Sequence, residues 1–444
     1  MKKVITYGTF DLFHEGHYRL LQRAKELGDY LIVGVTTEEY DQTRGKLNVL
    51  DPLLTRVENV KKTGFADEII IESSPGQKVR DIQRYEVDIF TVGSDWVGAF
   101  DYLKDYCQVV YLERTREISS TMLREQRHRI LRLGVIGTGR IAGRFMTEAR
   151  AVSGVNVQGV YNPRWGSAQE FSRRWEVNAY RDLEAFFQAV DAVYIASPHG
   201  SHYGYAKAAL ERDRHVLCEK PMVLSRAEGE ELAAMAKGRG LVLMEAIKTA
   251  YCPGFAQLLG IAGSGTIGTV RGVDACFTKL ADPGSRELTD LEWGGSFTEL
   301  GSYVLLPIIK LLGTQWSQLR FDSVKGENGL DLFTRAQFLY PGGMACATCG
   351  LGVKSEGKLV ISGTTGYIVV EAPWWKTTYF EIHREDPNEV EKFSAHFLGD
   401  GLRYELSDFL STINGSSRSD FKLTRKESVA LAGVMEQFLK ENRS

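Results

Sequence analysis

The sequence predicts an α/β fold in which two parallel-sheet domains are followed by an α+β domain with a mainly antiparallel sheet. A strand followed by a glycine and a helix start opens the chain at residues 3–17 and recurs at residues 132–146. Strand and helix patterns alternate after each of these starts, which is typical of parallel sheets. After about residue 255, strand-like runs follow one another with few helices between them, which indicates antiparallel pairing.

Length and composition limit the number of domains and the classes of partner. A chain of 444 residues is too long for one ordinary core and predicts two to three domains. The composition, 43% hydrophobic and 25% charged, is that of a soluble globular protein, and the net charge of −3 argues against a nucleic-acid partner. No apolar run reaches the roughly 20 residues of a membrane span, and the N-terminus lacks a signal-peptide pattern. We therefore expect a cytoplasmic protein without a membrane span.

The six cysteines are scattered and are expected to be reduced thiols. Only Cys346 and Cys349 are close in sequence. A single C-x-x-C with no second pair and no histidine partner is weak evidence for zinc. We therefore predict no dedicated metal site.

The first domain, residues 1–128, begins with a strand at residues 3–7 that Gly8 stops. From His17 to Leu27 apolar positions recur at helical spacing. Four further strand-like runs alternate with helical segments and predict a parallel sheet of about five strands. They lie at residues 30–37, 67–71, 87–96 and 108–115.

The second domain, residues 129–254, follows a polar and basic stretch at residues 120–131 that has no core-like period. A strand at residues 133–136 leads into Gly137, Gly139 and Ala142, the G-x-G-x-x-A pattern of a Rossmann-like dinucleotide-binding domain. Its other strands are predicted at residues 155–162, 191–198, 215–221 and 241–248. The third domain, residues 255–444, carries strand-like runs at residues 269–278, 335–341, 344–352, 358–371 and 378–384.

Two histidines, His14 and His17, lie between the first strand and the following helix. Unpaired backbone N–H groups and the positive end of the helix dipole favour an anion at such a junction. An imidazolium beside that dipole also needs a negative charge nearby, and a phosphate satisfies both requirements. The pair therefore predicts a phosphate site in preference to a purely structural role.

Three separated motifs in the first domain support this interpretation. They are YGTFDLFHEGH (7–17), GSDW (93–96) and RTREISST (114–121), and together they resemble the glycerol-3-phosphate cytidylyltransferase family over residues 1–126. The resemblance implies attack of a substrate phosphate on the α-phosphorus of CTP, with pyrophosphate as leaving group and with His14 and His17 as catalytic residues. Such a reaction depends mainly on placement and charge neutralisation.

The same resemblance implies a set of contacts to CTP and its phosphates: Thr9, Phe10, Asp11, Asp95, Arg114, Ser119, Ser120 and Thr121. Asp11 and Ser119 are equally well explained as helix caps. Mg²⁺ is expected to arrive with the triphosphate and not in a protein cage.

One position departs from this family. The family usually carries a second arginine eight positions after the one that matches Arg56, and here that position is Gly64. We therefore expect glycerol 3-phosphate to be a poor acceptor, or to lose against another polyol phosphate. The candidate acceptor-binding cations that remain are Arg44, Lys46, Arg56 and Lys78.

The stretch at residues 196–222, which ends in Glu219-Lys220-Pro221, and the stretch WGGSFTELGSYVL (293–305) resemble the Gfo/Idh/MocA family of NAD(P)-dependent oxidoreductases. The resemblance implies that Lys220 lies near the nicotinamide and polarises a substrate carbonyl or hydroxyl. Tyr303 takes the place of the family's usual histidine. It can pass a proton to the nascent alkoxide if Lys220 lowers its pKa, although an amphipathic core position also explains it. Glu299 stands where an aspartate is usual.

The second strand of this domain ends in VYNPR and lacks the acidic residue that binds the ribose of NAD. Asn162 and Arg164 take its place, which favours NADP(H) over NAD(H) and leaves both open. The full set of NAD(P)-binding candidates is Gly137, Gly139, Arg140, Ile141, Ala142, Asn162, Arg164, Ser197, His199, Glu219 and Lys220. His199 and His202 are equally well explained as loop or helix-cap residues.

Joining both activities predicts a bifunctional enzyme that makes a CDP-alditol. The oxidoreductase would reduce an aldose or ketose phosphate to an alditol phosphate, and the first domain would transfer a cytidylyl group to it. In the families resembled, such activated polyols feed teichoic acid or capsule biosynthesis. The alternative is a monofunctional cytidylyltransferase with a non-catalytic cofactor-binding or dimerisation module. A homodimer formed through the sheet of the third domain would suit the resemblance.

Overall fold

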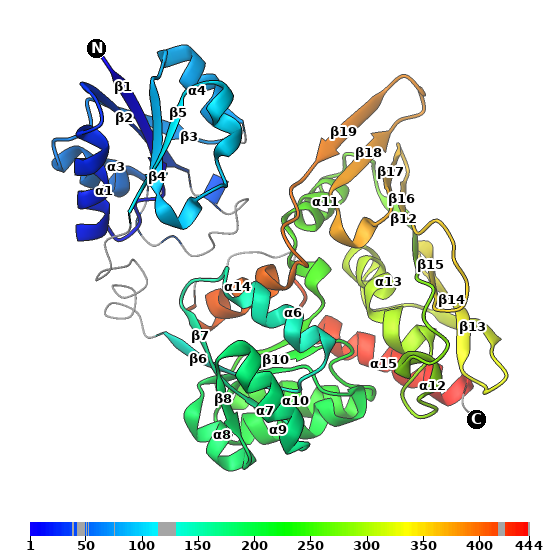
Figure 1. Cartoon of the computed structure of the whole chain (residues 1–444). Coiled ribbons are helices and arrows are strands. Elements are labelled where there is room, and N and C mark those ends of the chain that lie inside the picture. Colours follow the sequence, from blue (N-terminus) through cyan, green and yellow to red (C-terminus); the bar gives the residue numbers. More distant parts are fainter. Residues whose placement is uncertain are drawn as a thin grey trace. The chain divides into compact units, whose positions relative to one another are not determined.

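The computed structural model describes residues 1–37, 40, 41, 49, 51, 53–74, 76–113, 130–415 and 422–442, and of Asp95 only the backbone. The chain divides into two compact units (Figure 1). The first contains residues 1–130 and 151–154, and the second contains residues 131–150 and 155–444. The predicted domain limits stay predictions.

The first unit contains a sheet of five parallel strands in the order β3-β2-β1-β4-β5. The strands are β1 (Lys3–Gly8), β2 (Tyr30–Thr36), β3 (Glu68–Glu72), β4 (Ile89–Gly93) and β5 (Gln108–Leu112). The helices are α1 (Glu15–Lys25), α3 (Leu53–Lys62) and α4 (Gln77–Tyr85), with the short η1 (Ser94–Trp96) and η2 (Asp101–Asp105). The predicted parallel sheet is thereby confirmed.

Both faces of this sheet are buried because its strands are apolar at successive positions. Val4 of β1 belongs to a core that also contains Leu21 of α1 and Val60 of α3. The next residue, Ile5, belongs to a separate core on the other face, together with Ile82 of α4. Helices on both faces leave the C-terminal ends of the strands as the place where polar side chains gather.

The second unit begins with a sheet of six parallel strands in the order β11-β10-β9-β6-β7-β8. The strands are β6 (Leu131–Ile136), β7 (Val155–Tyr161), β8 (Asn178–Tyr180), β9 (Ala192–Ile195), β10 (His215–Glu219) and β11 (Leu243–Ala246). The helices are α6 (Arg140–Ala149), α7 (Trp165–Trp175), α8 (Leu183–Ala189), α9 (His202–Glu211) and α10 (Arg226–Gly238), with η3 (His199–Ser201) and η4 (Lys248–Tyr251).

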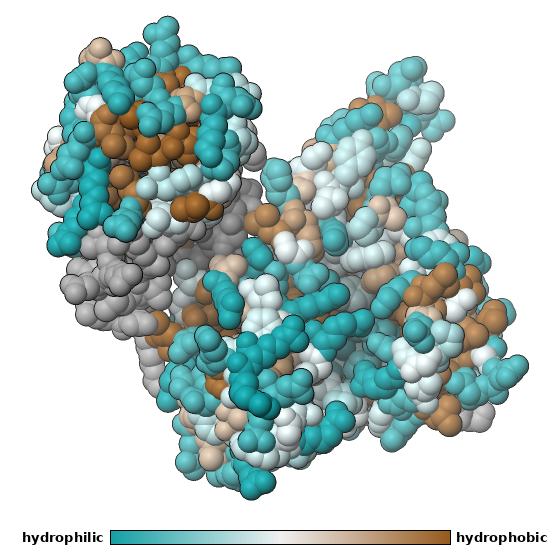
Figure 2. All heavy atoms as spheres, in the orientation of Figure 1, coloured by the Kyte–Doolittle hydropathy of each residue, from teal (hydrophilic) through white to brown (hydrophobic). Residues whose placement is uncertain are grey.

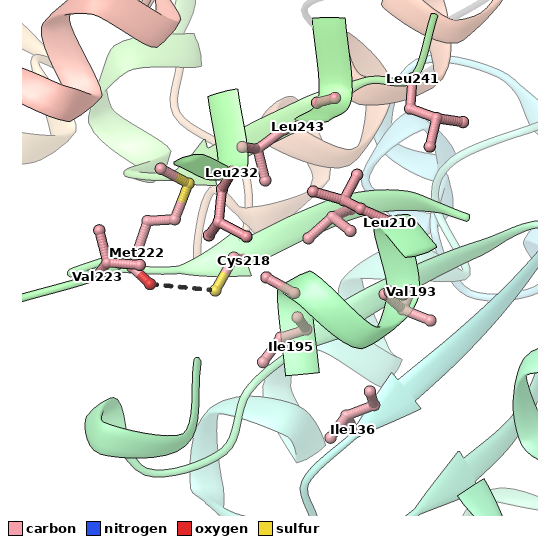
Figure 3. Packing of buried hydrophobic residues seen from close by; sticks show 14 of the residues in the cluster. Ile136, Val193, Ile195, Leu210, Cys218, Met222, Val223, Leu232, Leu241 and Leu243 are labelled. Atoms are coloured by element: carbon pink, nitrogen blue, oxygen red, sulfur yellow. Dashed lines mark hydrogen bonds between the residues drawn. The ribbon is translucent and has the colours of Figure 1, made fainter. Parts of the chain in front are cut away.

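One face of this sheet packs against α8, α9 and α10 (Figure 3). Val193, Ile195 and Leu243 from the strands meet Leu210 of α9 and Leu232 of α10 in a single core. At the end of β10, the Cys218 thiol donates to the Met222 carbonyl at 3.8 Å, which ties down the loop that carries Lys220. The hydrophobic core therefore fixes the strand end from which a candidate catalytic side chain emerges.

A second sheet in this unit has eight strands in the order β13-β14-β15-β12-β16-β17-β18-β19, and only the β12–β15 pair is parallel. The strands are β12 (Val270–Thr278), β13 (Gln318–Lys325), β14 (Asp331–Tyr340), β15 (Gly343–Gly350), β16 (Leu359–Gly363), β17 (Tyr367–Val370), β18 (Tyr379–His383) and β19 (Val390–Ser394). The helices are α11 (Pro253–Gly263), α12 (Arg286–Thr289) and α13 (Ser296–Leu312), with η5 (Trp374–Lys376). The predicted mainly antiparallel sheet is confirmed.

The two last helices, α14 (Leu402–Ile413) and α15 (Arg425–Asn442), return to the six-stranded sheet. Helix α14 packs on α6, and Arg403 pairs with Glu148 at 2.7 Å. Helix α15 packs on α10 and on α13. The C-terminal helices therefore connect the parts of the second unit that carry the two sheets.

Apolar side chains remain exposed on the eight-stranded sheet. Leu339 and Met344 are cross-strand partners with 42% and 66% of their surface exposed, although polar residues dominate the face drawn in Figure 2. An apolar patch on a sheet is compatible with the predicted homodimer, which stays a prediction. No helix in the described part of the chain is long and apolar enough to cross a membrane.

The structure differs from the sequence prediction at several elements. Helix α1 begins at Glu15 and not at His17, because the His14 side chain accepts from the Gly16 N–H and caps the helix two residues earlier. Strands β8, β13 and β19 were not predicted, since they are short or alternate between half-buried and exposed positions at sheet edges.

All six cysteines lie in described segments and none forms a disulfide. Cys346 and Cys349 both lie on β15, three residues apart, so their side chains point to opposite faces of the sheet. Among the described residues, no group of histidine, cysteine, aspartate or glutamate side chains is placed to hold a metal ion.

Candidate functional site

The first site lies where β1 ends and α1 begins. The rings of His14 and His17 stack with their centroids 4.0 Å apart and an interplanar angle of 22°. The Phe10 ring contacts the His17 ring edge-on, at a centroid distance of 5.5 Å. The structure thus brings the two predicted catalytic histidines together at the helix N-terminus, where the unpaired N–H groups favour an anion.

The loop before these histidines has an unusual backbone. Phe10 and Leu12 have φ values of 54° and 49°, in the left-handed region that side chains rarely adopt. Two carboxylates hold the loop in this shape, since the Asp51 N–H donates to Asp11 at 2.9 Å and the Leu12 N–H donates to Asp51 at 3.0 Å. Left-handed residues of this kind persist where surrounding contacts over-determine them, which is typical of functional sites.

Asp11 therefore orders the loop, and the cap of α1 is His14 and not Asp11. Thr9 is similarly engaged, because its hydroxyl donates to Asp41 at 3.0 Å. Their predicted contacts to CTP stay predictions.

Arg56 is wholly buried, with 0% of its surface exposed. Its guanidinium donates to the carbonyls of Thr9 and Thr36, each at 2.8 Å, and to that of Asp51 at 2.9 Å. These carbonyls lie after β1, at the end of β2 and before α3. Arg56 therefore holds together the segments that carry the first site, a supporting role that the sequence reasoning missed.

Lys78, another predicted acceptor cation, is also buried. Its ammonium pairs with Glu72 and lies 4.5 Å from the centroid of the Tyr7 ring. Tyr7 in turn donates to Asp81 at 2.9 Å, and burial with these acids raises the pKa of the Tyr7 phenol. Its predicted acceptor role stays a prediction. Six further predicted residues, and the side chain of Asp95, lie outside the described residues: Arg44, Lys46, Arg114, Ser119, Ser120 and Thr121.

The second unit contains a cavity of about 1270 Å³. It is larger than the roughly 300–1,000 Å³ of an ordinary small-molecule pocket and has room for a dinucleotide and a second ligand. Lysine and arginine outnumber aspartate and glutamate nine to five among its lining residues, so it favours anionic ligands. Residues from both sheets of the unit form its wall.

Two glycines form the phosphate end of this cavity. Gly137 has a φ of 109°, and a Cβ atom there would lie 2.5 Å from the Ala196 carbonyl oxygen. A Cβ atom at Gly139, before the first turn of α6, would meet nothing within 4 Å. The space in front of Gly139 and the helix N-terminus therefore fits a dinucleotide pyrophosphate, as the G-x-G-x-x-A pattern predicts.

The end of β7 carries no acidic side chain. Asn162 donates to the Thr138 hydroxyl at 2.9 Å and accepts from the Arg164 N–H at 2.8 Å. Arg140, Arg144 and Arg164 line this part of the cavity. A 2′-phosphate on the adenosine ribose suits these cations better than a free 2′-hydroxyl.

Replacing Arg164 by alanine should therefore reduce the preference for NADPH. Loss of a charged hydrogen-bond partner predicts that kcat/KM for NADPH falls by about 10-fold while that for NADH changes little. Arg181→Ala is a matched control, because Arg181 packs on the Trp165 ring and does not line the cavity. An unchanged cofactor preference in Arg164→Ala would show that this arginine does not contact the ribose.

Lys220 is one of the residues that line the cavity. Its ammonium donates to the Glu299 carbonyl at 2.8 Å, lies 3.3 Å from the Glu299 carboxylate, and lies 5.7 Å from the centroid of the Tyr303 ring. The neighbouring Glu219 accepts from the Tyr194 hydroxyl at 2.6 Å, and burial raises the pKa of its carboxyl. The structure thus brings Lys220 next to Glu299 and Tyr303, although Lys220 lies about 80 residues before them in sequence.

Tyr303 differs from the sequence expectation. Its pKa lies well above the ordinary value because the phenol is buried and because Glu219, Glu405 and Glu299 are near it. The stated condition, that Lys220 lowers this pKa, is not met, since burial and the three glutamates raise it. Tyr303 therefore keeps its proton and suits the role of proton donor in a reduction.

Glu405 of α14 is a residue that the sequence reasoning missed. It is 0% exposed, and neither carboxylate oxygen has a hydrogen-bond partner among the described residues. Burial and the proximity of Glu219 raise its pKa well above the ordinary value. No local pattern identified it, because α14 reaches the site through packing on α6, η4, β10 and β11.

The pH dependence of reduction follows from the raised pKa of Tyr303. A proton-donating tyrosine is active while protonated, so its contribution is lost only as the pH rises through its pKa. We expect kcat for reduction to show no tyrosine-dependent fall up to about pH 10, and Tyr303→Phe to lower kcat by about 10²-fold. A pH–rate profile checks this, and a wild-type fall near pH 8 that Tyr303→Phe lacks would contradict it.

The two predicted cavity histidines have different roles. His199 lies 3.6 Å from the Glu299 carboxylate, and burial together with Lys220 lowers its pKa well below the ordinary value. His202 is fully buried, with its ring nitrogens 2.9 Å from the Pro221 carbonyl and 2.8 Å from the Ser197 carbonyl. His202 therefore connects two cavity-lining loops, whereas His199 presents a neutral imidazole to the site.

Two family models match the chain. The model described as "Cytidylyltransferase-like" matches residues 5–126, and "Oxidoreductase family, NAD-binding Rossmann fold" (GFO_IDH_MocA) matches residues 131–247. Glycerol-3-phosphate cytidylyltransferase of Bacillus spizizenii is 49% identical over 125 residues, which are 28% of this chain and 96% of the relative. Trans-1,2-dihydrobenzene-1,2-diol dehydrogenase of Sus scrofa is 30% identical over 324 residues, 70% of this chain and 96% of the relative.

The chain belongs to both families, one in each part. It is a cytidylyltransferase fused to a Gfo/Idh/MocA oxidoreductase. The scyllo-inositol 2-dehydrogenase (NADP(+)) IolU of Bacillus subtilis is 28% identical over 330 residues, 70% of this chain and 97% of the relative. Among solved structures, the 3-ketoreductase KijD10 of Actinomadura kijaniata, in complex with TDP-benzene and NADP, has a TM-score of 0.59. At 23% identity over 69% of this chain and 96% of that chain, it shows a shared fold alone.

Proposed function

We propose that this bifunctional enzyme makes a CDP-alditol in two steps. The oxidoreductase reduces an aldose or ketose phosphate, and one hydride and one proton form the new C–H and O–H bonds of an alditol phosphate. A phosphate oxygen of that product then attacks the α-phosphorus of CTP, and pyrophosphate leaves. The observation that carries the proposal is the fusion itself, because an alditol phosphate is a reductase product and also a cytidylyl acceptor.

In the oxidoreductase, the cofactor supplies the hydride. Residues of the chain polarise the carbonyl and donate the proton. Lys220 polarises the substrate carbonyl, which develops negative charge as it is reduced. Tyr303, protonated because of its raised pKa, donates the proton to the nascent alkoxide. Glu299 holds the Lys220 ammonium through its carbonyl and carboxylate oxygens.

In the cytidylyltransferase, the stacked pair His14 and His17 stabilises charge that builds on the oxygen between the α- and β-phosphates. The N-terminus of α1 adds its dipole to this stabilisation. Mg²⁺ would accompany the triphosphate.

The identity of the cytidylyl acceptor distinguishes this proposal from the strongest competing one, in which glycerol 3-phosphate is the acceptor. Identity of 49% with a glycerol-3-phosphate cytidylyltransferase favours glycerol 3-phosphate as a second candidate acceptor. Gly64 argues against it, since this residue closes α3 with a φ of 73° and carries no cation. Pyrophosphate release from CTP with glycerol 3-phosphate, ribitol 5-phosphate and other alditol phosphates tests this. We expect a longer alditol phosphate to exceed glycerol 3-phosphate in kcat/KM.

The alternative of a non-catalytic oxidoreductase part is tested by cofactor oxidation. Turnover of NADPH with a sugar phosphate favours the two-step proposal, and absence of turnover with a broad panel of sugar phosphates favours the alternative. The presence of Lys220, Glu299 and Tyr303 in one cavity supports an active site.

We further propose NADP(H) as the cofactor. We also propose a cytoplasmic location, where CTP and NAD(P)H are available, and a role in teichoic acid or capsule biosynthesis.

A further inference from the structure

The cations of the cavity in the second unit form two groups, according to the elements that carry them. Four arginines, Arg140 and Arg144 on α6 and Arg164 and Arg174 at α7, line the part that fits the dinucleotide. The other group, Lys248, Lys279, Arg286 and Lys376, lies on η4, after β12, on α12 and on η5. The pyrophosphate and 2′-phosphate of a dinucleotide account for the first group only.

The second group lies beside the catalytic side chains. The Phe277 ring meets the Tyr303 ring edge-on at 5.4 Å and stacks on the Trp375 ring at 3.6 Å with an interplanar angle of 7°. Lys279 is two residues beyond Phe277, and Lys376 directly follows Trp375. All four of these residues line the cavity, so two of the cations border the aromatic wall next to Tyr303.

Arg286 reaches the same region from α12. Together with burial and Lys220, it lowers the pKa of His199, whose ring lies 3.6 Å from the Glu299 carboxylate. The carboxylate of Glu299 also pairs with Lys220 at 3.3 Å. Arg286 is therefore electrostatically coupled to the site where the substrate carbonyl is polarised.

Among the described residues these cations have no close carboxylate partner, a property that they share with Arg164 and Arg174, and Lys376 lies 5.4 Å from the centroid of the Phe397 ring. Within the described segments, no carboxylate lies within 4.0 Å of the ammonium or guanidinium groups of Lys248, Lys279, Arg286 or Lys376. By contrast, Arg140 pairs with Glu287 at 3.7 Å and Arg144 pairs with Asp400 at 3.6 Å. Uncompensated like charges around one cavity repel each other, and a bound dianion relieves that repulsion.

We infer that Lys279, Arg286 and Lys376, supported by Lys248, form a phosphate subsite, and that the oxidoreductase substrate is a sugar phosphomonoester. The inference rests on the proposed function and names its substrate class. A neutral sugar leaves these cations without an anionic partner, whereas a terminal phosphate offers three oxygens to groups that come from three different elements. The aromatic wall of Phe277 and Trp375 then borders the carbon chain between the phosphate and the carbonyl.

The test compares matched ketoses with and without phosphate. NADPH-dependent reduction is measured with D-ribulose 5-phosphate and D-ribulose, and with dihydroxyacetone phosphate and dihydroxyacetone. Wild type should prefer the phosphorylated member of at least one pair by about 10²-fold or more in kcat/KM. Lys279→Gln, Arg286→Gln and Lys376→Gln should each raise KM for that substrate by about 10-fold, with kcat and the activity on the unphosphorylated sugar little changed.

Lys392→Gln is the matched control, because Lys392 is an exposed lysine of the same sheet that does not line the cavity. Inorganic phosphate supplies a second readout. It should quench tryptophan fluorescence of the NADP⁺-loaded chain through Trp375, and the quenching should be lost in Arg286→Gln and retained in Lys392→Gln. This titration needs no turnover, so it decides the case even if wild type reduces none of the four sugars.

Equal kcat/KM for both members of each pair, or a KM unaffected by all three substitutions, would overturn the subsite. So would fluorescence quenching that is absent in wild type or equal in Arg286→Gln. A stronger response to a nucleoside diphosphate sugar than to any phosphomonoester would overturn the substrate class. If the subsite results hold but CTP does not react with the reduced product, the proposed function fails while the phosphate subsite stands.

Discussion

Replacing Lys220 by alanine is expected to abolish NAD(P)H-dependent reduction, with kcat/KM falling by about 10³-fold or more. The ammonium is held by the Glu299 carbonyl at 2.8 Å beside Tyr303, so its loss removes the group that polarises the substrate carbonyl. It also removes the positive charge that lowers the pKa of the buried Glu219 carboxyl. Initial rates of NADPH oxidation with the best sugar phosphate give the measurement.

The other activity of the same chain is the internal control for Lys220→Ala. Pyrophosphate release from CTP should be unchanged, because Lys220 lies in the second unit and the histidine pair lies in the first. Thermal unfolding of the variant excludes a global defect. Reduction at more than one tenth of the wild-type rate would contradict the assignment of Lys220 as a catalytic residue.

Replacing His17 by alanine should lower cytidylyl transfer by about 10²-fold or more, as removal of a charge-stabilising donor does. The rings of His14 and His17 stack 4.0 Å apart at the N-terminus of α1, so both imidazoles can approach one polyphosphate. His14→Ala should have an effect of similar size. Reduction by the second unit should persist in both variants.

His14 requires its own matched control because its ring also caps α1. Loss of that cap alone costs about 1 kcal/mol of stability. Asparagine is a good N-cap without an imidazole, so His14→Asn should keep the melting temperature near that of wild type and still lose cytidylyl transfer. Near-normal pyrophosphate release in His14→Asn and His17→Ala would show that the two histidines are not catalytic residues.

The sequence was sufficient to predict the sheets and the positions at which several of their strands end. Buried strands such as β2 and β9 are apolar at successive positions, and Gly8 and Gly137 mark where two of the strands end. Because the C-terminal ends of parallel strands meet at one edge, the motifs placed there were already close to the candidate sites. Lys220 and Tyr303 are about 80 residues apart in sequence. Only the family resemblance predicted that they share one site.

Other features depend on contacts that no local pattern encodes. The sequence predicts Arg56 as an acceptor-binding cation, which stays a prediction, but it did not show that the fold buries this residue among three backbone carbonyls. Glu405 comes close to Tyr303 from the returning helix α14, and burial together with Glu219, Glu405 and Glu299 raises the pKa of Tyr303. Trp375 joins the aromatic wall through η5, a turn without a periodic signal.

The central claim is that the product of one unit is the substrate of the other. Its most direct test is a single incubation of the purified chain with NADPH, CTP, Mg²⁺ and D-ribulose 5-phosphate or another sugar phosphate that it reduces. The reaction is followed by mass spectrometry. We predict a CDP-alditol that forms only when both NADPH and CTP are present, and that is absent in Lys220→Ala and in His17→Ala. A mixture of the two variants should restore it. Efficient use of glycerol 3-phosphate, with no CDP-alditol from any reduced sugar phosphate, would contradict the account.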